Sequence, residues 1–511
     1  RKEEIVVRIQ LNENWRVRPT QDGLELMAPE HNIALELSDL AFRDELVAVL
    51  IGETEISAGN KTIEETLQRL EGAGAISAQE GFTRQNPSST KREEAAWRIR
   101  RDFVGPRGPI MSVYWLNPSQ SKLSLSRTHL FTAKYRERTG HGEEMREAWA
   151  SGSDADWGQA EFKAIMEALE RHACGIIPQE QLVRSTARKL KNQALDPRRI
   201  VVYTKAQYKN NLPFVPFSKD REYWWKSVKV SPEGYEKYVP IECLYYPAGH
   251  ELSHNLYTAA NSSGVAAGLT FEDALLRGIY EAIERDAFMI TWLIRASMPL
   301  IDQRTISEEC RERVYSLESL GYRMYFVDIT LELAPVVLAV GVSEKVRPSL
   351  VIGAASNPDI EKAVEKSLSE VEHQLYWEWR DPENIHSISD PTEVNKIPDH
   401  TALYASSEHL SKAVFLWGGE TRPMNKSNFG IQDTSAVMEK LKQHGFQTAV
   451  LDLTPEYLKK TGVYVVRVIP LGLIPISFGY GMEPLGMARY TQMAKRGNPW
   501  PGPVPFPHPF S

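Results

Sequence analysis

Two short stretches of this 511-residue chain nearly repeat each other, and each closes an apolar segment with helical periodicity. The stretches Glu167–Ala173 and Glu281–Ala287 share the pattern Glu-x-x-Glu-Arg. Glutamates three residues apart project from one helix face, so two such helices brought together would aim four carboxylates at one point. Close carboxylates repel each other unless cations lie among them. Because oxygen ligands suit magnesium ions that bridge nucleotide phosphates, the pair of motifs indicates an ATP site.

A single motif of this kind is more often a solvated ion pair between residues four apart on a helix. Here the neighbouring positions on both helices are apolar, which predicts helices that are largely buried. These neighbours are Phe162, Ile165, Met166, Leu169, Leu275, Leu276, Ile279 and Ile283. Glutamates on a buried helix need partners, so the paired motifs favour a functional site.

A second repetition relates three segments in which an alanine precedes a glutamate by seven residues. The pairs are Ala160 with Glu167, Ala274 with Glu281, and Ala363 with Glu370. Seven residues make two helical turns, so each pair shares a helix face. Segments 321–330 and 445–454 also match in their glycine, aspartate and threonine, and each precedes a strand-like run at 336–342 or 464–469. We expect an α/β fold of α+β layers with internal duplication, although helix, glycine and strand also follow one another in unrelated units.

Composition excludes several classes of partner and location. The formal charge of −7 has no long basic block, which argues against nucleic acid or an anionic membrane as partner. Three separated cysteines support neither a disulfide framework nor a zinc site, and no apolar run reaches the roughly 20 residues of a membrane span. We expect a cytoplasmic protein. Because the numbering begins at Arg1 rather than at a methionine, a preceding targeting segment stays an open alternative.

The first 82 residues have the pattern of a small separate module. Alternating strands are expected at 5–11, 15–19, 24–28 and 33–37, followed by helices of which the second spans 62–72. This order is typical of a winged-helix-like module. The polar stretch 83–94 contains Pro87 and lacks apolar periodicity, so we interpret residues 83–96 as a linker. The large domain then comprises residues 97–511.

Two further segments could contact a ligand. The loop Asn261–Thr270 places small residues, including Ser262 and Ser263, before the second glutamate helix, where backbone amides could approach a phosphate. A plain turn with a cap at Thr270 is the alternative, since acidic residues in the first turn suit a helix without any ligand. The tail 498–511 alternates prolines, which favours polyproline II and could carry the carboxylate of Ser511 to a fixed point. A disordered end, or a ligand for a partner's aromatic groove, is the alternative.

These motifs, in this order, resemble the signatures of the YcaO family over about residues 97–511. The segment 262–268 leading into 281–287 is the most specific part of the resemblance. The tail, with Pro503, Pro505 and Pro507, looks like that of the azoline-forming cyclodehydratases, which act on ribosomally made peptides. The resemblance implies a YcaO-type domain that uses ATP and Mg2+.

The implied reaction activates a backbone amide. A substrate Cys, Ser or Thr side chain attacks the preceding carbonyl, the amide oxygen takes the γ-phosphoryl of ATP, and loss of phosphate leaves a thiazoline or oxazoline. Such chemistry asks mainly for positioning and charge neutralisation. The implied metal ligands are Glu167, Glu170, Glu281 and Glu284. The implied further contacts to the nucleotide are Ser262, Ser263, Arg285 and Glu370, with Gln374 one turn later as a weaker candidate. The implied general base or organiser of the site is Ser511, which Pro505 and Pro507 carry.

Two positions depart from the family pattern. Ser153 lies in Gly-Ser-Asp where the family commonly has Gly-Lys-Gly, and Leu269 stands where an asparagine that contacts the nucleotide is often found. These departures keep open a degenerate member that binds the precursor peptide or a sister enzyme without catalysis. A YcaO enzyme that forms thioamides is a second alternative, which the proline tail disfavours.

The N-terminal module resembles the winged-helix peptide-recognition element of these pathways. A leader peptide would add there as a strand, with Leu24–Ala28 or its neighbour as the receiving edge. A purely structural role is the alternative. The chain has no Gly-x-Gly-x-x-Gly unit and no cysteine pairs of an E1-like domain, so a separate partner protein is expected beside the precursor peptide, with a homodimer as one assembly.

Overall fold

The computed structural model describes the chain in segments. These are residues 8–11, 16–20, 23–28, 31–36, 66, 70, 76–79, 91–105, 108–116, 128–138, 145–210, 212–246, 256–258, 261–379, 385–426, 429, 431 and 433–510. By its internal contacts the chain forms two units, the first made of residues 1–117, 129–137 and 147–169, and the second of residues 118–128, 138–146 and 170–511. This division differs from the predicted one near residue 97.

The first unit begins with the four strands that periodicity predicts. Strand β1 (Arg8–Leu11) pairs with β5 (Ile76–Gln79), and β2 (Arg16–Thr20), β3 (Gly23–Ala28) and β4 (His31–Glu36) form an antiparallel sheet. Because β3 is hydrogen-bonded on both sides, Leu24–Ala28 itself is not an outer strand; its neighbours β2 and β4 are the outer strands of this sheet among the described residues, and the receiving edge stays a prediction. The expected helix 62–72 lies mostly outside the described residues, and the winged-helix assignment stays a prediction.

The rest of the first unit joins helices to a three-stranded sheet of order β6-β7-β8. Its elements are α3 (Lys91–Phe103), β6 (Ile110–Leu116), β7 (His129–Arg138), β8 (Met145–Asp154) and α4 (Trp157–Cys174). Residues 91–96, interpreted as linker, are helical, because Ala95, Ile99 and Phe103 give α3 a buried stripe at helical spacing. Arg100 of α3 is buried and pairs with Glu161 of α4 at 2.5 Å.

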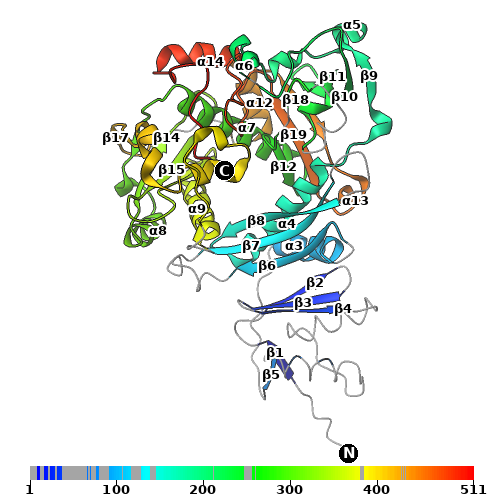
Figure 1. Ribbon diagram of the computed structural model, residues 1–511. Coiled ribbons are helices and arrows are strands. Elements are labelled where there is room, and N and C mark those ends of the chain that lie inside the picture. The colour runs from blue at the N-terminus through cyan, green and yellow to red at the C-terminus, as the bar shows by residue number, and fades with distance from the viewer. Residues whose placement is uncertain are drawn as a thin grey trace, which may run out of the picture. The chain divides into compact units, whose positions relative to one another are not determined.

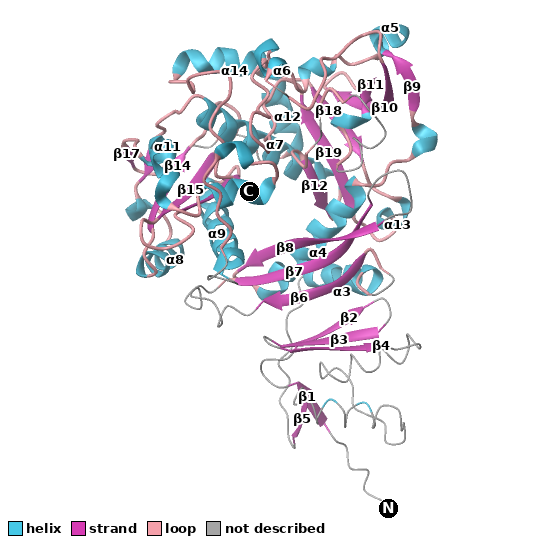
Figure 2. Ribbon diagram, viewed as in Figure 1, coloured by secondary structure: helices cyan, strands magenta, loops and turns pink. Residues whose placement is uncertain are grey.

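Two larger sheets form the second unit (Figures 1 and 2). One has the order β11-β10-β18-β19-β12, with β9 also paired to β10, and the other has the order β16-β15-β14-β13-β17. The strands of the first are β9 (Val183–Thr186), β10 (Glu222–Ser231), β11 (Tyr235–Pro240), β12 (Val265–Gly268), β18 (Thr448–Asp452) and β19 (Tyr464–Pro470). Those of the second are β13 (Leu300–Ile301), β14 (Arg323–Asp328), β15 (Val336–Val342), β16 (Leu350–Ser356) and β17 (Thr421–Arg422).

Helix α7 (Phe271–Leu293) contacts β12 and β19 of one sheet and β15 and β16 of the other. It begins where the Thr270 side chain accepts the amide of Asp273, an N-cap of the expected kind. Helices α8 (Glu308–Ser319) and α9 (Ile360–Trp379) cover the opposite face of the second sheet. Every residue of β15 and β16 is therefore buried, as expected for strands with both faces covered.

Shorter helices complete the described part of the second unit. They are α5 (Ala187–Leu190), α6 (Lys205–Lys209), α10 (Ile397–Leu403), α11 (Leu410–Ala413), α12 (Thr434–Gln443), α13 (Glu456–Lys459) and α14 (Ala488–Met493). Among the described residues, no helix is both long and apolar enough to cross a membrane.

The two matching sequence segments fold in the same way. Gly321 follows α8 and Gly445 follows α12, with φ of 102° and 83°. In each copy the threonine amide donates to the aspartate two residues before it, and the threonine hydroxyl accepts an amide of the following strand segment. The alanines of the three alanine–glutamate pairs all lie fully buried on α4, α7 and α9. Common descent of these units stays a prediction.

Candidate active site

Helix α4 carries the first glutamate pair, and each glutamate accepts the backbone amide of a nearby strand. Glu167 accepts from Ser151 of β8 at 3.2 Å, and Glu170 accepts from Ala267 of β12 at 3.1 Å. Both side chains are half-buried. Glu167 belongs to the first unit and Glu170 to the second, so the arrangement described below is that of the second unit. The amide contacts fix each carboxylate in place.

Helix α7 carries the second pair together with an arginine. The side chains of Glu281, Glu284 and Arg285 are 22, 14 and 19 % exposed. Arg285 Nε lies 3.7 Å from Glu281 Oε1, and Nη1 lies 3.6 Å from Glu284 Oε1, which are too long for good hydrogen bonds. The buried Nη1 atom has no hydrogen-bond partner. One arginine therefore neutralises two carboxylates incompletely.

The pKa of Glu284 is raised to about 7, mainly by burial and in smaller part by the nearby carboxylates of Glu281 and Glu370. The positive charge of Arg285 and the amide of Ser356, which donates to Glu284 Oε2 at 3.1 Å, act in the opposite direction. A carboxyl with this pKa carries less than a full charge at neutral pH. A divalent cation beside it would favour the ionised form.

The buried thiol of Cys174 lies near carboxylates of both glutamate helices. Burial raises its pKa to about 12, and the next largest contribution is the charge of Glu170, with a smaller one from Glu281. Both carboxylates therefore lie near the same buried group at the end of α4. Within the second unit, Glu170 of α4 and Glu281 of α7 thus lie near one buried thiol, and Glu370 of α9 lies close enough to Glu284 to affect its pKa; a single site made of all four motif glutamates stays a prediction.

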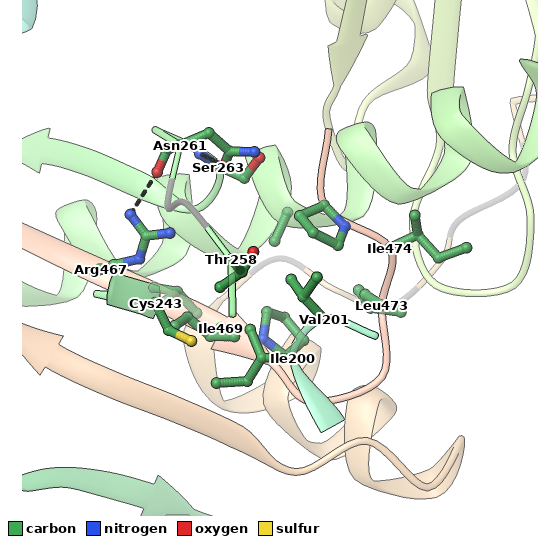
Figure 3. Close-up of a pocket in the computed structure, with 14 residues that line it drawn as sticks. Ile200, Val201, Cys243, Thr258, Asn261, Ser263, Arg467, Ile469, Leu473 and Ile474 are labelled. Atoms are coloured by element: carbon green, nitrogen blue, oxygen red, sulfur yellow. Dashed lines mark hydrogen bonds between the residues drawn. The ribbon is translucent and has the colours of Figure 1, made fainter. Parts of the chain in front are cut away.

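A cavity of about 50 Å³ lies beside this cluster, between β19 and the loop before β12 (Figure 3). Arg467 of β19 points to the loop and donates from Nη1 to the carbonyl of Asn261 at 2.6 Å. The side chain of Asn261 in turn accepts the amide of Ser263 at 2.9 Å. Arg467 Nε and Ser263 Oγ are buried without a hydrogen-bond partner. Two unsatisfied donors, one on β19 and one on the loop expected to bind phosphate, suit an anionic ligand.

Sequence reasoning missed Arg467. Burial lowers its pKa, and no carboxylate among the described residues forms a salt bridge with it, although the negative charge of Glu281 acts on it. A signal was present, because Arg467 is the one charged residue in the otherwise apolar run 463–476. A lone cation in a buried central strand needs an anionic partner or a functional reason.

The remaining predicted residues take different positions. Glu370 lies on an exposed part of α9 but close enough to affect the pKa of Glu284. Ser262 is half-buried and accepts the amide of Val265 through its carbonyl. The side-chain oxygen of Gln374 accepts the amide of Ile352, and its side-chain nitrogen donates to the hydroxyl of Thr401. These hydrogen bonds indicate a structural role.

The proline tail reaches the cluster from the other end of the chain. Pro505 and Pro507 are buried, and Phe510 lies with its ring 4.3 Å from the guanidinium carbon of Arg285. This contact is a cation–π interaction. Ser511 lies outside the described residues. The last described residue of the tail thus sits at the arginine between the two α7 glutamates.

The structure also describes Ser153 and Leu269, the two residues that depart from the family pattern. Ser153 is buried, and its carbonyl accepts a hydrogen bond from Lys163 Nζ at 2.8 Å. Lys163 also pairs with Asp154 at 2.7 Å, so a lysine from α4 lies beside the Gly-Ser-Asp segment. Leu269 is half-buried between the end of β12 and the N-cap of α7.

The donor set fits magnesium bound together with a nucleotide. No group of three His, Cys, Asp or Glu side chains within the described segments could hold a metal ion alone. Mg2+ usually takes one or two protein carboxylates and fills its other positions with phosphate oxygens and water. Glu281, Glu284 and Glu170 could supply such carboxylates, and the unsatisfied donors of Arg285, Arg467 and Ser263 could meet phosphate oxygens.

Comparison with known proteins shows the family to which this chain belongs. The family model described as YcaO cyclodehydratase, ATP- and Mg2+-binding, matches residues 151–473. These residues contain both glutamate pairs, the loop before β12, Glu370 and Arg467. The match covers more than half of the chain, and the protein therefore belongs to the YcaO family. An uncharacterised protein of Methanothermobacter thermautotrophicus is 24 % identical over 333 residues, which are 63 % of this chain and 81 % of that protein.

Solved structures share the fold at low identity. A heterocyclase in complex with substrate and cofactor has a TM-score of 0.67 and 20 % identity, and the match covers 82 % of this chain but only 57 % of that one. YcaO from Methanopyrus kandleri, bound with AMPPCP and Mg2+, has a TM-score of 0.55 and 22 % identity, covering 81 % of this chain and 95 % of that one. A chain of the E. coli microcin synthetase McbBCD complex has a TM-score of 0.50 and 14 % identity, covering 68 % and 85 %. These likenesses establish a shared fold.

Proposed function

We propose that this protein is an ATP- and Mg2+-dependent cyclodehydratase that converts Cys, Ser or Thr residues of a ribosomal precursor peptide into thiazoline or oxazoline. One observation carries the proposal: the end of a proline-rich tail lies at Arg285, between two half-buried glutamates. The family match supports ATP and magnesium. The likeness to a heterocyclase supports ring formation rather than another use of the same nucleotide site.

The proposed reaction forms a ring and removes the amide oxygen as phosphate. The substrate thiol or hydroxyl adds to the preceding carbonyl carbon, and the oxygen of this adduct takes the γ-phosphoryl group of ATP. Phosphate then leaves as the carbon–nitrogen double bond forms, and the protons of the side chain and the amide are released. The products are azoline, ADP and inorganic phosphate. The step needs no oxidant.

Each part of the site has a proposed role. Bound Mg2+ would neutralise phosphate charge, and Glu167, Glu170, Glu281 and Glu284 are its proposed ligands. Arg285 faces the same anions. We add Arg467 with Ser263 as a second anion contact, because their buried donors have no partner. Ser511, held by the tail, is the proposed general base or organiser, since a base must lie within hydrogen-bond reach of the proton that it takes.

The peptide is proposed to bind the first unit through its leader. An extended leader would add to an outer strand of the β2-β3-β4 sheet, which means β2 or β4. A separate partner protein is proposed as well, since a structure similar to this chain is part of the microcin synthetase complex. A homodimer remains one proposed assembly.

The decisive experiment combines the protein with ATP, Mg2+ and the precursor peptide encoded beside its gene. A cyclodehydratase gives a mass loss of about 18 Da per ring together with phosphate release, because the elements of water leave the peptide. Glu281→Gln should abolish both signals. Glu318→Gln, an exposed glutamate of α8, serves as the matched control and should retain them.

A catalytically inactive scaffold is the competing proposal, and Ser153 and Leu269 favour it because each replaces an expected nucleotide contact. A scaffold would bind the precursor peptide and release no phosphate, even with candidate partner proteins present. A gain in peptide mass from exchange of an amide oxygen for sulfur would instead identify a thioamide-forming enzyme. Either result overturns the cyclodehydratase assignment.

A further inference from the structure

The end of the proline tail is held by side chains rather than by secondary structure. Prolines at positions 503, 505, 507 and 509 lack an amide hydrogen, so this segment cannot build a regular ladder of backbone hydrogen bonds. Its carbonyls still need donors once they are buried. Residues 507–510 are all buried, in the second unit close to α7 (Figure 1).

Three consecutive carbonyls of the tail each receive one donor. Trp292 Nε1 donates to the carbonyl of Phe506 at 2.8 Å, and the hydroxyl of Tyr404 donates to that of Pro507 at 2.7 Å. The ring of His400 contacts the next carbonyl, that of His508, through Nδ1 at 2.7 Å. Trp292 belongs to α7, while the other two donors lie in and just after α10. Two separate elements thus hold successive peptide units of the tail, and we call these three hydrogen bonds, from Trp292, Tyr404 and His400, the grip.

The histidine contacts fix one arrangement of protons. His400 accepts the amide of Gly479 at Nε2, at 2.9 Å, so its Nδ1 carries the proton that is donated to the tail. His508 accepts the amide of Phe510 at Nδ1 and contacts the carbonyl of Ser477 through Nε2. The two rings stack with centroids 4.3 Å apart. Both rings are therefore neutral, and each of the four ring nitrogens has a backbone partner.

The grip determines where the tail ends. His508 holds the amide of Phe510 at 3.2 Å, and the Phe510 ring packs against Phe288 of α7 as well as over Arg285. Arg285 in turn lies between the two glutamates of α7. A change in the grip would therefore move the tail relative to the charged cluster without altering the cluster itself.

A second contact holds the tail upstream. Arg295 has φ of 46°, at the position after a helix where glycine is preferred. Such a conformation costs a side chain about 1 kcal/mol. Here the side chain donates to the carbonyls of Asn498 and Pro499 at 2.8 and 3.2 Å and lies over the ring of Trp500. These contacts give a physical reason for arginine at this position.

We propose that Trp292, Tyr404 and His400 are positioning residues, which capture three successive carbonyls of the tail and hold its end at Arg285. The proposal rests on the proposed function, in which the end of the tail takes part in catalysis. The three residues act through the tail and need not touch the substrate. Their loss should lower kcat while leaving the KM for ATP unchanged, since none of them belongs to the carboxylate cluster.

Tyr404→Phe is the mildest test, because it removes one hydroxyl and keeps the ring. Tyr322→Phe is the matched control: this hydroxyl is equally buried and donates to the carbonyl of Pro348 at 2.6 Å, remote from the tail in sequence and within another cluster. Both variants lose one buried hydrogen bond, so both should be destabilised to a similar degree. Only Tyr404→Phe should release the tail and reduce kcat.

Release of the tail can be measured without the peptide reaction. Carboxypeptidase Y, which accepts a proline before the residue that it removes, followed by mass spectrometry, reports how fast Phe510 is released after Ser511. We expect about a tenfold faster release in Tyr404→Phe, the factor that corresponds to a buried hydrogen bond worth about 1.4 kcal/mol. Tyr322→Phe should match the wild type. Equal rates in the two variants would overturn the proposal, even if azoline formation is observed.

Two substitutions at His400 distinguish positioning from simple packing. His400→Asn keeps a donor near the position of Nδ1, whereas His400→Leu removes it and retains comparable volume. The asparagine variant should keep tail release nearly as slow, and kcat nearly as high, as in the wild type. The leucine variant should show faster tail release and a lower kcat. Identical behaviour of both would contradict the assigned role. If tail release follows the expected order while no azoline forms, the grip is established and the proposed function is wrong.

Discussion

The substitution Glu284→Gln tests two effects of a buried carboxylate: the stability that it costs the folded protein and the nucleotide binding that it supports. The side chain is only 14 % exposed, and its pKa of about 7 lies well above the ordinary 4.5. At roughly 1.4 kcal/mol per pH unit, that difference corresponds to about 3 kcal/mol. Because burial disfavours the carboxylate, the folded protein without ligand loses this stability as the pH rises from about 4.5 through 7.

Glutamine keeps an acceptor for the amide of Ser356 but carries no charge. The variant should therefore be more stable than the wild type at pH 8, by about 3 kcal/mol because the pKa already includes the attraction to Arg285, and equally stable near pH 4. Urea denaturation at both pH values measures the difference. A variant that is less stable than the wild type at pH 8 would refute the argument that burial of the carboxylate is costly.

The same substitution should remove nucleotide binding. In the wild type, affinity for a non-hydrolysable ATP analogue with Mg2+ should rise between pH 6 and 8, approaching tenfold per pH unit below 7, because a metal ligand must be deprotonated. Isothermal titration of the variant should show weak binding without this pH dependence. Glu318→Gln should behave as the wild type in both assays. Tight binding by Glu284→Gln would exclude this carboxylate from the metal site.

Three further predictions test other parts of the structure. Arg467→Lys should weaken ATP binding tenfold or more in isothermal titration, because lysine lacks the second donor that the cavity leaves unpartnered. Burial lowers the pKa of His400 to about 4, so this histidine alone should subtract up to about 3 kcal/mol from the free energy of unfolding as the pH drops from 6.5 to 4, which urea denaturation measures as the change in the difference between the wild type and His400→Asn. Gly264→Ala should give little folded protein on expression, since its Cβ would lie 2.0 Å from the carbonyl oxygen of Val468, whereas Gly445→Ala meets nothing within 4 Å and should cost only about 1 kcal/mol.

Local patterns predicted the elements of the fold well. Strands with alternating residues, the helices with buried alanines, and the glycine-to-threonine segments all occur where periodicity and turn chemistry place them. The sequence did not decide between Leu24–Ala28 and its neighbours as the outer strand, because strand order within a sheet is a long-range property that the strand sequence does not encode. The error at residues 91–96 arose because charged residues hid the first turn of an amphipathic helix.

The site was predictable only where its residues share a motif. The four glutamates stand in two matching helices, so a shared role could be proposed for them from spacing, and that role stays a prediction. Arg467 and Tyr404 could not be found in this way, because the first meets Asn261 and the second meets Pro507 across about 200 and 100 residues of sequence. Such contacts depend on how the two sheets and the tail pack, which no local pattern specifies.

The unsatisfied groups around α7 argue against a scaffold. Arg285 Nη1, Arg467 Nε and Ser263 Oγ are buried without a hydrogen-bond partner, and each such group costs about 1 to 3 kcal/mol, to which the charge of Glu284 adds its own penalty. A protein that used this region only for packing would be more stable with apolar residues there. If these groups exist to meet Mg2+ and phosphate, saturating ATP analogue with Mg2+ should raise the unfolding free energy by about 3 kcal/mol at one hundred times the dissociation constant. Unfolding that is insensitive to the nucleotide would leave these costs without a reason and would favour the scaffold.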